Sequence, residues 1–341
     1  MRIYRFDRLN GLDHLTLHDE PTPKPQRGEV LVKIRAVSLN YRDVAIPLGR
    51  YVWNAQPNLV PCSDAAGEIV AVGEGVNAFR PGDRVISVFH PRWFGGRPPL
   101  TATADTYGSG QDGWLAEYKA VSQEAVVRLP DGPSYEEGST LPCAGVTAWN
   151  ALSGPDPVRA GSTVLTLGSG GVSVFAIQLA KLLGATVIAT TSSDRKGQIL
   201  KGFGADVVVN YAAIERWGRH VKTALTGGVG VDCVVDVVGP ATVNQSLDAV
   251  RWGGNVVLIG FLSNQGPAID YFHLKGAGAA IRSIGVGDRT MLDELIRAVA
   301  GARVKPAIDR LFAFTDAKEA FRYLASGSHI GKVVVRLDDA S

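Results

Sequence analysis

The chain has 341 residues, which is enough for about two domains of roughly 150 residues each. Its 45% hydrophobic and 20% charged residues are typical of a globular protein, and a net charge of +2 gives no electrostatic reason to expect a nucleic acid or membrane partner. No apolar run reaches the length of about 18 residues that a membrane-spanning helix needs.

The chain starts without an apolar signal segment, and its three cysteines are scattered. Cys62, Cys143 and Cys233 form no C-x-x-C pair, so the sequence predicts neither a disulfide framework nor a common structural zinc motif. We therefore expect a protein of the reducing cytoplasm.

The first 130 residues indicate short strands separated by turns. Residues 29–37 alternate apolar and polar side chains, and 68–72 and 84–89 are similar runs bounded by glycines. This part predicts a β-rich barrel or sandwich with little helix before about residue 135.

From Ser134 the pattern changes to alternating helices and strands. Ser134 and Glu137 form a capping box before a helical stretch at 141–152. Strands are then expected at 163–167, 186–190, 206–209, 232–237 and 255–259, with helix-like stretches between them. This order is typical of an α/β fold with a doubly wound parallel sheet. The tail predicts helices at 291–300 and 316–324 and a strand at 332–336.

A glycine turn separates the strand at 163–167 from the next helix. Its residues are Gly168, Gly170, Gly171 and Val172, followed by Ser173 where a dinucleotide fingerprint has its third glycine. A tight turn before a helix N-terminus suits a pyrophosphate, so we predict a dinucleotide site here. Ser173 is expected to loosen the helix–strand packing slightly.

The strand at 186–190 is not followed by the acidic residue that an NAD site places on the ribose hydroxyls. Hydroxyl and cationic side chains stand there instead, which favours NADP(H). The residues expected to bind this end of the cofactor are Ser192, Ser193, Lys196 and Tyr211. Asp194 is expected to support the start of the next helix, which Ser193 caps, and Arg195 and Lys196 also fit a solvated helix face.

Several motifs together resemble the medium-chain dehydrogenase/reductase superfamily, in particular its zinc-free branch of quinone oxidoreductases and NADP-dependent alcohol dehydrogenase-like proteins. The motifs lie at residues 37–43, 60–73, 79–85, 141–149 and 328–334, and they follow the family order over the whole chain. The resemblance implies a GroES-like catalytic domain at 1–130, completed by 265–341, and a Rossmann NADP-binding domain at 131–264. It also implies a homodimer joined through the Rossmann sheets.

The departures from the zinc alcohol dehydrogenases point to a site without metal. Asn40 and Ser63 stand where that branch has Cys and His ligands, and only Cys143 matches. Catalytic zinc needs three protein ligands, and the loop at 90–113 has no cysteine for a structural zinc. We interpret Cys62 and Cys143 as buried thiols that pack like small apolar side chains. The alternative is a displaced zinc ion bound by Cys62, Asp64 and Cys143.

Without a metal, hydride transfer is easier to a quinone or a polarised C=C, because the negative charge delocalises into a phenolate or enolate. The resemblance implies that Asn40 is the active-site amide, which supplies a hydrogen bond to that oxygen. It likewise implies that Tyr51 is the proton donor, with Tyr41 as the nearer competitor. Asp43 is grouped with these catalytic candidates, although local hydrogen bonding or orientation of Arg42 explains it better than acid–base work.

Two further features are assigned to the cofactor and the substrate. Val237 and Gly239 end one strand and Phe261 follows the next, so all three are expected to line the nicotinamide pocket. The long aromatic loop at 89–113 is expected to form either a substrate lid or a surface excursion.

Three functions remain open at this stage. The first is NADPH-dependent reduction of quinones or α,β-unsaturated carbonyls without zinc. The second is an alcohol dehydrogenase acting on alcohols and aldehydes, and the third is a non-catalytic NADPH-binding redox sensor.

Overall fold

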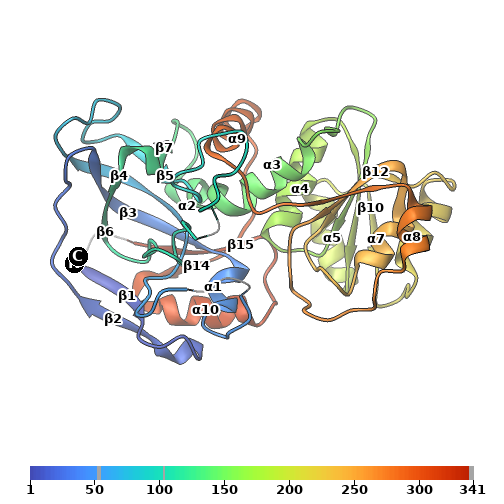
Figure 1. Ribbon diagram of the computed structural model, residues 1–341, viewed down its shortest axis with the longest axis horizontal. Helices are drawn as coiled ribbons and strands as arrows, with labels where there is room; N and C mark the ends of the chain where they lie inside the picture. Colours follow the sequence, from blue (N-terminus) through green and yellow to red (C-terminus); the bar gives the residue numbers. More distant parts are fainter. Residues whose placement is uncertain (52–54, 103, 338–341) are drawn as a thin grey trace. The chain divides into compact units, whose positions relative to one another are not determined.

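The computed structural model describes residues 1–51, 55–102 and 104–337, and the chain forms two compact units (Figure 1). The first unit comprises Met1–Val146 and Gly287–Ser341, and the second comprises Thr147–Val286. The sequence placed the second domain at 131–264. The second unit starts later than predicted because residues such as Gly138 pack against Leu129 and Ile86 of the first unit. It ends later than predicted because the strand at residues 280–283 extends its sheet.

An antiparallel sheet forms the centre of the first unit. Its strand order is β14-β15-β3-β4-β5-β7, with β6 also paired to β3, and only the β14–β15 pair is parallel. The strands are β3 (Glu29–Leu39), β4 (Asp64–Val72), β5 (Arg84–Ser87), β6 (Tyr118–Ser122), β7 (Val126–Arg128), β14 (Ile308–Ala313) and β15 (Lys332–Arg336). Because β15 pairs with β3, the end of the chain completes the N-terminal domain, as expected.

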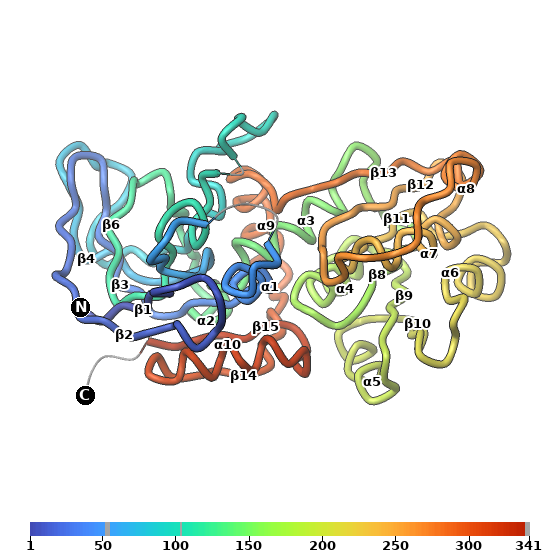
Figure 2. The backbone as a smooth tube through the Cα atoms, turned by 60° about the horizontal axis from the view of Figure 1, so that its bottom comes forward, coloured from blue at the N-terminus to red at the C-terminus, as the bar shows by residue number. Residues whose placement is uncertain are grey.

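A hairpin and short helices cover this sheet. The hairpin is β1 (Arg2–Phe6) with β2 (Leu15–Asp19), and the helices are α1 (Tyr41–Ala45), α2 (Tyr135–Ser139), α9 (Arg289–Ala302) and α10 (Ala317–Ala325). Figure 2 shows α10 beside the hairpin, where the buried rings of Phe6 and Phe321 meet with centroids 5.7 Å apart. The core of this unit therefore joins the two ends of the chain.

The second unit is a six-stranded parallel sheet of order β10-β9-β8-β11-β12-β13. The strands are β8 (Thr163–Leu167), β9 (Thr186–Thr191), β10 (Val207–Asn210), β11 (Val231–Asp236), β12 (Val250–Leu258) and β13 (Ala280–Ser283). The chain enters in the middle at β8, moves outward to β10 and returns to β11, which is the doubly wound order that the sequence predicted. Ligands of such sheets bind where the order reverses, at the carboxyl ends of β8 and β11.

Helices precede β8 and connect the strands of the second unit. They are α3 (Val146–Leu152), α4 (Gly171–Leu182), α5 (Asp194–Gly202), α6 (Trp217–His220), α7 (Val243–Ala249) and α8 (Tyr271–Ala277). Among the described helices, none is both long enough and apolar enough to cross a bilayer.

Local sequence signals at the start of the helical part are confirmed, with one difference. Ser134 Oγ accepts from the N–H of Glu137 at 3.2 Å, and the Glu137 carboxylate accepts from the N–H of Ser134 at 2.9 Å. The expected helix at 141–152 instead begins as a π-helical turn, Leu141–Gly145, before α3. Pro142 lies in that turn and has no N–H to donate to a helical ladder.

Candidate functional site

The polar site of the first unit begins where β3 ends and α1 starts. Asn40 is the residue before α1, and its N–H donates to Asp43 Oδ2 at 2.7 Å. Asp43 is only 1% exposed, and burial raises its pKa to about 6, against the opposing charge of Arg42. Its Oδ1 has no hydrogen-bond partner among the described residues. Asp43 therefore holds the start of α1, as the local interpretation expected.

A chain of polar contacts runs from Asn40 to the start of β4. Asn40 Nδ2 lies 3.5 Å from Ser63 Oγ, and Ser63 Oγ donates to Asp64 Oδ1 at 2.6 Å. Asp64 Oδ2 accepts from the N–H of Cys143 at 3.0 Å. Burial raises the pKa of the Asp64 carboxyl above its usual value, although the charge of Lys332 and these hydrogen bonds oppose the shift. The structure thus brings together the three positions at which the zinc branch has its ligands.

These residues do not fit a zinc ion. Asn40 and Ser63 are poor zinc ligands, and burial raises the pKa of the Cys62 and Cys143 thiols, which would have to lose their protons to bind. Both oxygens of Asp64 already accept hydrogen bonds. Across residues 1–51, 55–102 and 104–337, no group of three or more His, Cys, Asp or Glu side chains is arranged to hold a metal.

Lys332 is a member of this site that the sequence analysis missed. It is the first residue of β15 and is 3% exposed. Its Nζ donates to Asn40 Oδ1 at 2.5 Å and to the carbonyl oxygen of Leu39 at 2.6 Å. The motif at 328–334 contains this lysine, but only the pairing of β15 with β3 shows what it contacts.

Arg42 organises the aromatic side of the site. It is 6% exposed, and its guanidinium donates to the carbonyl oxygen of Tyr107 at 2.9 Å and to Thr106 Oγ1 at 3.0 Å. Its central carbon lies 5.2 Å from the ring centroid of Tyr51 and 4.8 Å from that of Phe89. Burial raises the pKa of the Tyr51 phenol, and Arg42 opposes that shift. Tyr51 therefore holds its proton at neutral pH.

The other candidate tyrosine, Tyr41, lies beside this arrangement. It is the first residue of α1 and is half-buried. The structure thus places all four catalytic candidates within one stretch from the end of β3 to Tyr51.

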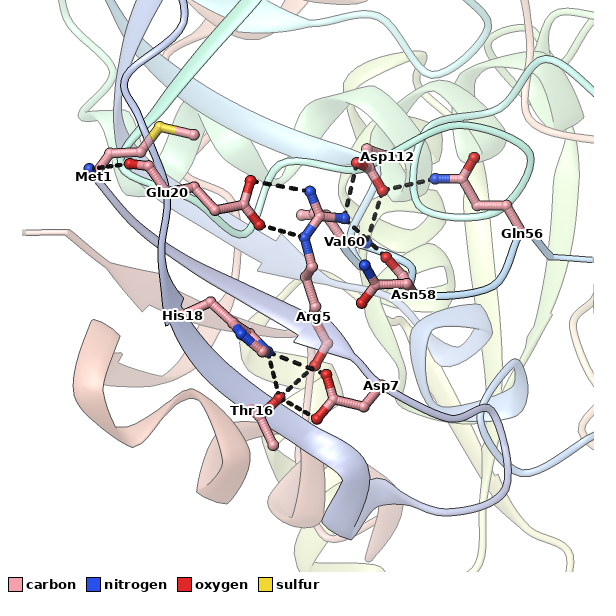
Figure 3. Close-up of polar contacts among 10 residues, drawn as sticks. All are labelled: Met1, Arg5, Asp7, Thr16, His18, Glu20, Gln56, Asn58, Val60 and Asp112. Carbon is pink, nitrogen blue, oxygen red and sulfur yellow. Dashed lines mark hydrogen bonds and ion pairs between the residues drawn. The ribbon is translucent and has the colours of Figure 1, made fainter.

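The loop at 89–113 is anchored near both ends and exposed in its middle. Figure 3 shows Asp112 accepting from Arg5 at 3.0 Å, from Gln56 at 2.7 Å and from the N–H of Val60 at 2.9 Å. Tyr107 is buried against Trp114, whereas Leu100 is fully exposed. A substrate lid stays a prediction for the exposed part around Leu100, with a surface excursion as its alternative.

The glycine turn of the second unit follows β8. Gly168 has φ +78°, and a Cβ added at Gly168 or Gly170 would meet nothing within 4 Å, so the turn faces open space. Gly171 and Val172 begin α4, whose first N–H groups are free to bind an anion. Ser173 does not loosen the packing as expected, because its buried hydroxyl donates to the carbonyl oxygen of Leu167 at 2.7 Å. The turn fits a dinucleotide pyrophosphate.

The next strand end carries the expected ribose-side residues. Ser192 follows β9, and Ser193 Oγ caps α5 by accepting from the N–H of Lys196 at 3.5 Å. The N–H of Tyr211 donates to the carbonyl oxygen of Thr191 at 2.9 Å, which places Tyr211 beside Ser192 at adjacent strand ends.

Asp194 supports the start of α5, as predicted. It begins α5, and its carboxylate accepts from Asn210 at 2.8 Å. Its position is therefore explained by local structure.

A buried carboxylate that the sequence analysis missed shapes the end of β11. Asp236 Oδ1 accepts from the N–H groups of Val238 and Gly239, each at 3.0 Å, and its other oxygen accepts from Ser246 Oγ at 2.8 Å. Gly239 has φ +96°, and a Cβ there would lie 2.9 Å from the carbonyl oxygen of Gly260. Asp236 therefore holds the turn that contains Val237 and Gly239. This turn packs against Gly260, at the end of the neighbouring strand and just before Phe261.

Comparison with known proteins identifies the family. A model described as an alcohol dehydrogenase GroES-like domain matches residues 26–131, and one described as a zinc-binding dehydrogenase matches 171–301. A zinc-type alcohol dehydrogenase-like protein of Schizosaccharomyces pombe is 39% identical over 99% of both chains. A chloroplastic quinone oxidoreductase of Triphysaria versicolor is 30% identical over 98% of both.

A solved NAD-dependent alcohol dehydrogenase is 31% identical, with a TM-score of 0.89 over 99% of this chain and 100% of that one. The matching models cover most of both units, and the relatives span the chain from end to end. The chain belongs to the medium-chain dehydrogenase/reductase superfamily and is an oxidoreductase with a GroES-like domain and a dinucleotide-binding Rossmann domain.

Proposed function

We propose that this oxidoreductase uses NADPH, needs no zinc, and reduces quinones or α,β-unsaturated carbonyl compounds. The observation that carries the proposal is the polar site around Asn40, where an amide donor and a half-buried phenol stand in place of a set of metal ligands. NADPH oxidation by metal-free protein in the presence of such acceptors is the test.

The acceptor class follows from what this site offers. Bound NADPH supplies a hydride, and the substrate oxygen then carries negative charge as a phenolate or enolate. Asn40 Nδ2 donates a hydrogen bond to that oxygen, which is worth about 3–4 kcal/mol in the transition state. Such an oxygen spreads its charge over conjugated carbons, so an amide donor suffices where a simple aldehyde needs a Lewis acid.

Tyr51 supplies the proton that completes reduction. Burial keeps the phenol protonated, and the Arg42 cation near its ring stabilises the tyrosinate that remains after the proton has left. Tyr41 is the alternative donor, because it directly follows Asn40.

The variant Tyr51→Phe is expected to lower kcat by about 100-fold, since a positioned general acid contributes at least that much. Tyr41→Phe is the matched control and is expected to leave kcat within about threefold, which is under 1 kcal/mol. Steady-state NADPH oxidation with one enone measures both. A larger loss in Tyr41→Phe would transfer the role of proton donor to Tyr41.

NADPH is expected to bind at least about tenfold more tightly than NADH, a difference of roughly 1.4 kcal/mol. No carboxylate directly follows β9 to repel a 2′-phosphate, Asp194 is paired with Asn210, and Lys196 lies in the first turn of α5. Fluorescence titration measures both affinities, and Lys196→Ala should reduce the preference. Equal affinities would contradict the preference, and tighter binding of NADH would favour NAD, the cofactor named for the solved alcohol dehydrogenase.

The second candidate function is alcohol oxidation. It is favoured by the zinc-type alcohol dehydrogenase-like protein of S. pombe, which is similar over its whole length. Activity with an alcohol and NADP⁺ that appears only after zinc is added would establish it.

We also propose a homodimer joined at β13, which ends the parallel sheet of the second unit. An unpaired edge strand exposes backbone groups that another chain can satisfy. Large apolar side chains are exposed on and near this edge: Ile281 on β13, Trp252 on β12, and Tyr271 and Phe272 on α8. The edge strand and these apolar side chains form one continuous surface, to which a second copy of the chain can bind.

Light scattering is expected to give twice the 36.1 kDa mass of the chain. Ile281→Lys should shift the protein toward monomer, because it introduces a charge at the edge strand. Leu182→Lys, at the end of α4, is the matched control and should stay dimeric. A monomer in the unmodified protein would contradict the proposal.

A further inference from the structure

Lys332 is an ammonium buried beside the candidate catalytic amide. It is 3% exposed, and its Nζ contacts two oxygens, Asn40 Oδ1 at 2.5 Å and the carbonyl oxygen of Leu39 at 2.6 Å. Taking an ammonium out of water costs several kcal/mol unless the surroundings compensate it. Here the compensation comes from these two oxygens and from the nearby carboxyl groups of Asp43 and Asp64.

The contact fixes which way the Asn40 amide points. An ammonium has only hydrogen-bond donors, so the amide atom that faces Lys332 must be the oxygen. A flipped amide would place its NH2 group against the ammonium and lose the contact. The amide nitrogen is therefore directed toward Ser63 and Asp64, with Nδ2 3.5 Å from Ser63 Oγ. In the proposed function this nitrogen is the donor to the substrate oxygen.

The charge of Lys332 also strengthens that donor. A hydrogen bond from a cation to the amide oxygen draws electron density away from the nitrogen, and hydrogen bonds in such a chain polarise one another. The Asn40 N–H groups thus become better donors to a negatively charged oxygen. Arg42 is a second cation near Asp43, but its guanidinium binds Tyr107 and Thr106.

We propose that Lys332 is a positioning residue that orients and polarises the Asn40 amide for the developing phenolate or enolate. The proposal rests on the proposed function, in which Asn40 contacts the substrate oxygen. Lys332 itself does not touch substrate. Its role differs from that of a merely structural lysine because it depends on a positive charge at this point, not only on filled space.

The test compares Lys332→Met, which fills similar volume without charge, with Lys332→Arg, which keeps the charge. Each is assayed by NADPH oxidation with a p-quinone, alongside NADPH titration and thermal unfolding. Lys332→Met is expected to lower kcat by about 30-fold, less than the loss of an oxyanion donor itself, with KM and NADPH affinity little changed. Lys332→Arg is expected to recover at least about fivefold over Lys332→Met.

A second lysine of the same unit, Lys119, is half-buried and supplies the matched control. Lys119 donates to the carbonyl oxygen of Asp112 at 2.8 Å and lies over the Tyr107 and Trp114 rings, outside the contacts of Asn40. Lys119→Met should lower stability without changing kcat. If Lys332→Met does not fold, Lys332→Gln replaces it, because a neutral amide still donates to Asn40 Oδ1 but carries no charge.

The outcomes separate this proposal from the proposed function. If the unmodified protein reduces no quinone or enone, the proposed function fails first. If it does, a neutral Lys332 variant with kcat within about threefold of the unmodified protein overturns the positioning role. Equal losses of kcat in the Met and Arg variants also overturn it, because the charge would then be irrelevant.

Discussion

Replacing Asn40 with Asp is expected to lower kcat/KM for a quinone by about 10²–10³-fold, the usual cost of removing one oxyanion donor. The change keeps the shape of the side chain and the oxygen that Lys332 binds, so the buried ammonium keeps its partner. It replaces the donating NH2 group with an oxygen that repels a phenolate. The loss should therefore appear in catalysis while the protein remains folded.

Steady-state kinetics at pH 8 and NADPH titration measure this effect. Asn10→Asp adds the same charge at an exposed position of the same unit and is the matched control. NADPH affinity should be unchanged in both variants. Catalysis by Asn40→Asp within about threefold of the unmodified protein would show that the amide is not the donor.

Replacing Gly113 with Ala is expected to lower the free energy of unfolding by at least about 3 kcal/mol, in the range of severe overpacking. A Cβ at Gly113 would lie 2.2 Å from the carbonyl oxygens of both Pro61 and Cys62. Those oxygens belong to backbone that cannot move without shifting Ser63 and Asp64 or breaking the hydrogen bond from the N–H of Trp114 to Cys62. Stability and the candidate site therefore depend on the same close approach.

Urea unfolding measures this prediction. Gly301→Ala is the control, because Gly301 lies in α9 with nothing within 4 Å of an added Cβ. Alanine favours a helix by up to about 1 kcal/mol over glycine, so this variant should be neutral or slightly more stable. Equal stability of Gly113→Ala and the unmodified protein would contradict the close packing at Cys62.

The sequence predicted those features that depend on local patterns. Alternating side chains predicted β3, and the glycine turn after β8 and the Ser193 cap were found from spacing alone. Such signals lie within a few residues of one another, where backbone geometry decides the outcome. The local geometry of the glycine turn and of the Ser193 cap was accordingly easier to predict than contacts between distant residues.

The partners of buried charges could not be predicted in this way. Lys332 and Asn40 are 292 residues apart, and only the register of β15 on β3 brings them together. The hydrogen bonds that the Asp236 carboxylate accepts depend on the turn after β11 and on α7. Composition likewise left a substrate lid and a surface excursion open for residues 89–113, whereas the contacts that Arg42 and Asp112 make with that loop depend on the fold.

The unit boundary was missed for a similar reason. It falls between Val146 and Thr147, inside the continuous helical stretch from Leu141 to Leu152. No turn signal marks such a point, because a helix that passes from one unit to the next needs no break.

The central claim is reduction without metal, and NADPH oxidation by chelator-treated protein of verified metal content tests it most directly. The acceptor panel contains quinones, cyclic enones, aldehydes and alkenyl thioesters. We predict turnover of a quinone or an enone by the metal-free protein, with no gain when zinc is restored. Activity that appears only with zinc and an aldehyde would contradict the account and establish an alcohol dehydrogenase, and NADPH binding without turnover of any acceptor would point to a redox sensor.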